Sequence, residues 1–93
     1  MAVLKTILGY EICLWDIEGN VFRGIPVVLI RKNHFTEIVS IENGEITHEM
    51  GDKIVRRSVR DGVYRWIADN IDKLIEEYAL ASSYTEDYKP KNF

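Results

Sequence analysis

Short runs of β-branched and aromatic residues fill the first half of the chain, and turn signals separate them. The first three runs cover residues 3–8, 10–17 and 21–31. Gly9 divides the first run from the second, and the Glu-Gly-Asn sequence at 18–20 divides the second from the third. Runs of this length and composition predict β-strands.

A hairpin follows, because Asn43 and Gly44 lie between two further runs at residues 35–41 and 45–50. Asn-Gly is the strongest short-range hairpin signal, since a type I′ turn needs positive φ at both central positions. This turn sets a register in which Val39 faces His48. One mostly apolar face of the hairpin would then carry Glu37, Val39, Ile41, Ile46, His48 and Met50.

The second half of the chain predicts one long helix from Ser58 to Leu80. Ser58 is a typical N-cap residue, and Asp61 stands in the acidic position of a capping box. For residues 53–57, before the helix, we favour a short further strand. Apolar residues then recur every three or four positions and form one stripe. The stripe consists of Val59, Val63, Trp66, Ile67, Ile71, Leu74, Ile75 and Tyr78.

These elements predict a single α+β domain over residues 1–81. We expect an antiparallel sheet of four to five strands, joined by hairpins as a meander and packed on one long C-terminal helix. Residues 82–93 are polar and contain Pro90, so we expect a partly flexible tail.

The predicted strands are apolar on both faces, and one helix covers only one of them. Cys13, Trp15 and Ile17 point to the face opposite Leu14. Either the sheet closes into a barrel-like shape or a second subunit covers this face. We favour a homodimer, the commonest oligomer, with Cys13, Trp15 and Ile17 as the self-association surface.

Composition places the chain among soluble globular proteins. It has 93 residues, of which 46% are hydrophobic and 29% charged, and this balance argues against global disorder. The net charge of −3 gives the whole chain no attraction to nucleic acid or membrane. A single cysteine forms no internal disulfide, so we expect a cytoplasmic protein. Its small size would also suit a viral or phage accessory protein.

Positive charge is concentrated in residues 53–65, which carry five basic residues and only one acid, Asp61. Arginine binds phosphate with two hydrogen bonds, so this block is a candidate contact for nucleic acid or phosphate. The alternative is a solvated corner paired with the hairpin acids Glu42, Glu45 and Glu49. The five basic residues are Lys53, Arg56, Arg57, Arg60 and Arg65.

No pattern in the sequence indicates catalysis, a metal site or a cofactor. His34 and His48 have no third ligand at a useful spacing, and Cys13 lies within an apolar run. The sequence therefore favours a small non-enzymatic protein that acts through protein–protein contacts, as a homodimer and with a further, unidentified protein partner. A nucleic-acid-binding or phosphate-binding module is the alternative, and we expect no membrane partner.

Overall fold

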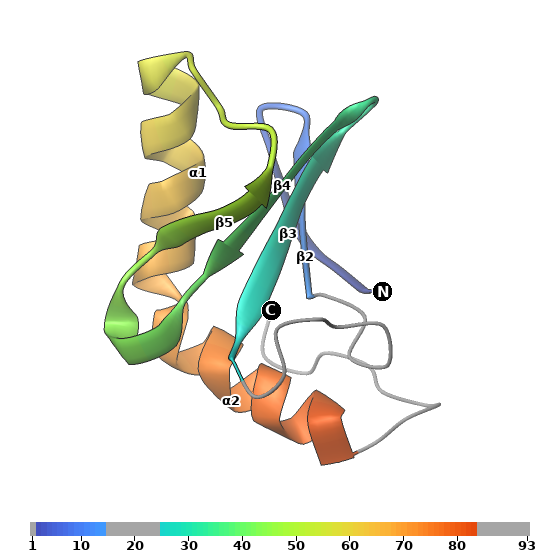
Figure 1. The fold of residues 1–93 in the computed structure, drawn as a ribbon, viewed down its shortest axis with the longest axis vertical. Helices are drawn as coiled ribbons and strands as arrows, with labels where there is room; N and C mark the ends of the chain where they lie inside the picture. Colours follow the sequence, from blue (N-terminus) through green and yellow to red (C-terminus); the bar gives the residue numbers. More distant parts are fainter. Residues whose placement is uncertain (1, 15–24, 84–93) are drawn as a thin grey trace.

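The computed structural model describes residues 2–14 and 25–83, and it shows one antiparallel sheet with two helices (Figure 1). The strands follow one another in sequence order across the sheet, each antiparallel to the next, as expected for a meander. The α+β class is therefore confirmed. The elements are β1 (Ala2–Ile7), β2 (Tyr10–Leu14), β3 (Val27–Lys32), β4 (Phe35–Ser40), the 3-10 turn η1 (Glu42–Gly44), β5 (Thr47–Gly51), α1 (Arg57–Asp69) and α2 (Ile71–Ser83).

The turn between β4 and β5 has the predicted geometry. Asn43 and Gly44 have φ values of 60° and 76°, and the backbone N–H of Glu45 donates to the carbonyl of Glu42 at 3.2 Å. These are the features of a type I′ turn. The predicted pairing of Val39 with His48 is also confirmed.

The predicted register is wrong beyond that pair, because β5 contains a bulge. Ile38 pairs with Met50, and Glu37 pairs with Gly51. The extra residue turns Met50 away from the face on which Val39 lies. Gly51 has a φ of +85°, and a Cβ there would collide with the carbonyl oxygen of Thr36.

The prediction of one long helix is wrong, because the helix ends at Asp69 and a second begins at Ile71. Asn70 lies between them with φ −115° and ψ 14°, and its side-chain amide donates to the carbonyl of Trp66 at 2.8 Å. That hydrogen bond satisfies a carbonyl at the end of α1. The chain then changes direction, and α2 crosses the end of the sheet (Figure 1).

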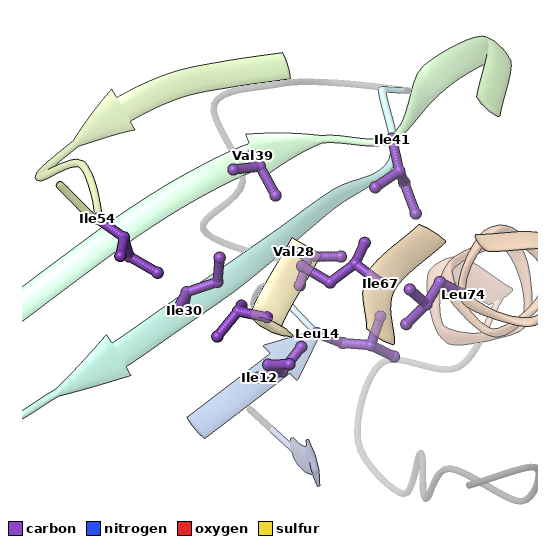
Figure 2. Packing of buried hydrophobic residues seen from close by; sticks show 10 residues of the cluster. Ile12, Leu14, Val28, Ile30, Val39, Ile41, Ile54, Ile67 and Leu74 are labelled. Atoms are coloured by element: carbon purple, nitrogen blue, oxygen red, sulfur yellow. The ribbon is translucent and has the colours of Figure 1, made fainter. Parts of the chain in front are cut away.

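The larger hydrophobic core lies between the sheet and the helices, as Figure 2 shows. Ile67 of α1 and Leu74 of α2 meet apolar side chains from β2, β3 and β4. The buried residues of this core are Ile12, Leu14, Val28, Ile30, Val39, Ile41, Ile54, Val63, Ile67 and Leu74.

A second, smaller core lies on the other face of the sheet. Buried Cys13, Val27, Leu29 and Ile38 form it together with Tyr78 of α2, and Ile25 packs against them. The bend at Asn70 explains this arrangement, because α2 contributes side chains to both cores. In this part of the sheet the apolar surplus is therefore buried within a single chain.

The structure leaves part of the predicted self-association surface and of the predicted tail undescribed. Trp15, Ile17 and residues 84–93 of the predicted tail lie outside the described residues. The proposed strand at residues 53–57 is wrong, because residues 52–56 form an irregular connection that leads into α1. Within the described ranges, no helix is long and apolar enough to cross a membrane.

We predict that Gly51→Ala destabilises the protein by about 2–4 kcal/mol. The residue has a positive φ, and a Cβ added there would collide with the carbonyl oxygen of Thr36. Gly44→Ala is the matched control, because Gly44 has a φ of +76° but no neighbouring atom within 4 Å. It should cost only about 1 kcal/mol. Urea unfolding measures both, and equal losses would contradict the proposed collision.

Candidate functional site

The candidate site is the basic corner, formed where the connection after β5 leads into α1. It consists of the basic residues of the predicted block. Its members are Lys53, Arg56, Arg57, Arg60 and Arg65.

Hydrogen bonds to β4 fix the connection that carries the corner. The backbone N–H of Asp52 donates to the carbonyl of Thr36 at 2.7 Å, and the N–H of Thr36 donates to the Asp52 side chain at 3.0 Å. Two residues later, Ile54 is buried in the main core, and its N–H donates to Oε1 of Glu37 at 3.4 Å. The basic side chains on either side of Ile54 are therefore attached to an ordered backbone.

Glu37 is the centre of this arrangement, because its carboxylate is fully buried and accepts hydrogen bonds from three further segments. The hydroxyl of Tyr64 in α1 donates to Oε2 at 2.5 Å, and Nδ1 of His48 in β5 lies 3.0 Å from the same oxygen. The N–H of Ile54 is the third partner. The side chain of Glu37 therefore connects β4 to β5, to α1 and to the connection that carries the corner.

Burial and the hydrogen bond to Glu37 raise the pKa of Tyr64 above its ordinary value. The phenol therefore stays protonated and remains a donor well into the alkaline range. One sign of this cluster is visible in the sequence, because the hairpin register places the polar Glu37 and His48 on a mostly apolar face. Only Tyr64 and the N–H of Ile54 were missed, because both come from beyond the hairpin.

The basic side chains point outward and have few acidic partners. Four of them are exposed, and Arg60 is half-buried. Among the described residues, the only ion pair of the corner joins Arg57 to Asp61 at 3.9 Å, with side chains 87% and 67% exposed. An exposed pair at that distance contributes little. No ion pair in the described part of the chain links the corner to Glu42, Glu45 or Glu49.

The start of α1 is electrostatically unusual. The predicted cap is wrong, because the N-cap is Arg56, without a side-chain hydrogen bond, and Ser58 lies inside the helix. The first turn carries no acid, so Arg56 and Arg57 stand at the positive end of the helix dipole. This arrangement disfavours the helix start and favours a negatively charged ligand.

Two apolar side chains are exposed near this corner. Val55, between Ile54 and Arg56, is 91% exposed, and Leu8 of the β1–β2 turn is 63% exposed. Leu8 lies beside α1, since a Cβ added at Gly62 would be 3.9 Å from its Cδ1. Both leave apolar surface available to a partner.

The other candidate residues are separate from the corner. Cys13 is fully buried, and burial raises the pKa of its thiol. It presents no surface to a second subunit, so the predicted interface at Cys13, Trp15 and Ile17 gains no support from its one described member. No group of three possible metal ligands occurs within residues 2–14 and 25–83. His34 is exposed in the β3–β4 turn.

Comparison with known proteins adds no assignment. No family matches the sequence, and no curated protein or solved structure is detectably similar to it.

We predict that Tyr64→Phe lowers stability by about 1–3 kcal/mol at neutral pH, because the buried carboxylate of Glu37 loses a donor. The raised pKa of Tyr64 also makes the wild type less stable as pH rises above about 10, where the unfolded phenol ionises first. Cys13 adds a loss of the same sign. Urea unfolding of both proteins from neutral to alkaline pH should show a shallower decline for Tyr64→Phe. Parallel declines would contradict the role of Tyr64.

Proposed function

We propose that this chain is a small non-enzymatic protein that binds nucleic acid or another phosphate-bearing polyanion through the basic corner. The observation that supports this most directly is that four of the corner's five basic side chains are exposed to solvent. In the described part of the chain, the hairpin acids expected to neutralise them form no ion pair with them. The alternative of an internally paired corner therefore loses its main support.

The chemistry of the corner suits phosphate. Arginine offers a planar fork of donors that matches two phosphate oxygens, and the uncapped start of α1 adds free backbone N–H groups. Residues 53–65 carry +4, whereas the chain as a whole carries −3. The attraction is therefore local, and we expect binding that depends strongly on salt.

The attachment to Glu37 adds rigidity to this surface. The hydrogen bond from the N–H of Ile54 to Glu37 fixes the backbone there. The backbone positions of the neighbouring Lys53 and Arg56 are therefore restrained before a ligand binds. A preorganised site loses less conformational freedom on binding than a flexible basic loop.

Protein–protein contact with a second copy of the chain is the second proposal. The apolar surplus of the sheet no longer favours it, because the apolar residues of β2, β3 and β4 on both faces are buried within one chain. A different surface does favour it, namely the exposed side of α1, where positive and negative residues alternate. A further protein partner could use the exposed Leu8 and Val55.

We predict that labelled single-stranded and duplex DNA and RNA bind the protein at about 50 mM NaCl and much less at about 200 mM. The double variant Arg56→Ala, Arg60→Ala should reduce the slope of log affinity against log salt by about two. The matched control is Lys5→Ala, Lys73→Ala, which removes the same charge from exposed positions in β1 and α2. It should bind nearly as the wild type does.

Equal losses in the two double variants would show that net charge, not the corner, governs binding. No binding of any of the four nucleic acids at the lower salt concentration would contradict the polyanion proposal. A preference for one strand form would identify the natural class of nucleic acid.

A further inference from the structure

We infer that the exposed side of α1 is a self-complementary docking surface on which a second copy of this chain lies antiparallel. This inference rests on the second proposal, the homodimer, and names its surface. It shares Arg57 and Arg65 with the basic corner, so its test measures self-association in the absence of any polyanion.

The surface is a row of four charged residues spaced four positions apart along α1. Arg57, Asp61, Arg65 and Asp69 are all exposed, and their signs alternate. Residues four apart lie next to one another on a helix, so the row forms one continuous ridge. It spans about 18 Å at 1.5 Å per residue.

Rows of this kind have a preferred way of packing. When two helices align their i, i+4 ridges, their axes cross at about 50°. Ser58 and Ala68, the exposed residues beside the row in α1, are small and leave room for a close approach.

A two-fold axis between Asp61 and Arg65 makes every contact of the row favourable. It places Arg57 opposite Asp69 of the second copy, and Asp61 opposite Arg65 of the second copy. Two-fold symmetry repeats each contact, so four pairs form and all join opposite charges. The same axis places Ser58 opposite Ala68, which gives a small residue on both sides.

The competing explanation is a solvated helix face whose charges pair within the helix. The row offers three such pairs at i, i+4. Among the described residues only Arg57 and Asp61 come within ion-pair distance, at 3.9 Å. Arg65 and Asp69 have no ion-pair partner in the described part of the chain, so they remain available to a second copy.

The surface predicts a weak and salt-sensitive association. Exposed ion pairs each contribute little, and salt screens them. We expect the dimer dissociation constant to rise about tenfold or more between about 50 and about 500 mM NaCl. A dimer held by an apolar interface would respond much less.

Charge reversal tests the register. One variant, Arg57→Asp with Arg65→Asp, makes the row entirely negative. The other, Asp61→Arg with Asp69→Arg, makes it entirely positive. Sedimentation velocity at about 50 mM NaCl should show the wild type dimerising at high protein concentration. Each variant alone should be monomeric, and an equal mixture should form a heterodimer.

A third variant carries all four reversals and serves as the matched control. Its row again alternates in sign and remains self-complementary, so it should dimerise like the wild type. Circular dichroism and thermal unfolding establish that each variant is folded, which the exposure of all four positions favours.

Three outcomes distinguish failure of the α1 surface from failure of the homodimer itself. A dimer that persists unchanged in both single-sign variants would use another surface, which overturns the inference and retains the homodimer. A mixture that stays monomeric while the wild type dimerises would overturn the pairing. A wild type that is monomeric at all accessible concentrations would reject both the homodimer and its surface.

Discussion

The hydrogen bonds of the buried Glu37 side chain tie the sheet to α1 and to the connection before it. The carboxylate joins β4 to β5 through His48, to α1 through Tyr64 and to the intervening connection through the N–H of Ile54. A carboxylate removed from water is costly unless donors replace its hydration. Because those donors come from three separate segments, the fold is held together where the basic corner begins, and loss of any one partner weakens the others.

Within the described residues, the bulge in β5 and the bend at Asn70 fit two helices to a small sheet. The bulge pairs Gly51 with Glu37, and a glycine there lets the two backbones approach closely beside Thr36. The bend turns α2 across the end of the sheet, so that Leu74 enters one core and Tyr78 the other. A straight helix of the same length would cover one face only, and a chain of this size has little other surface to bury.

The first helix combines a buried side that stabilises the fold with an exposed side that the fold does not use. Val63 and Ile67 anchor it in the core, so it tolerates a start at Arg56 without a cap and with positive charge at the positive end of its dipole. An uncapped helix start with positive charge goes against local helix preferences, and the fold does not require it. Such departures are typical of binding surfaces. The corner at the start of α1 and the alternating row along it are two surfaces of this kind.

Local patterns in the chain were enough to predict the α+β class, the meander, the Asn43-Gly44 turn and the segregation of basic residues. Each of these depends on neighbours within a few positions, through side-chain periodicity, turn conformation or charge. The tertiary structure alone decided the bulge, the break at Asn70 and the environment of Glu37. The break at Asn70 depended on whether a straight helix could bury its whole apolar stripe against the sheet, and the sequence does not contain that information. The carboxylate needed donors from residues 11 to 27 positions away, and local patterns do not register such contacts.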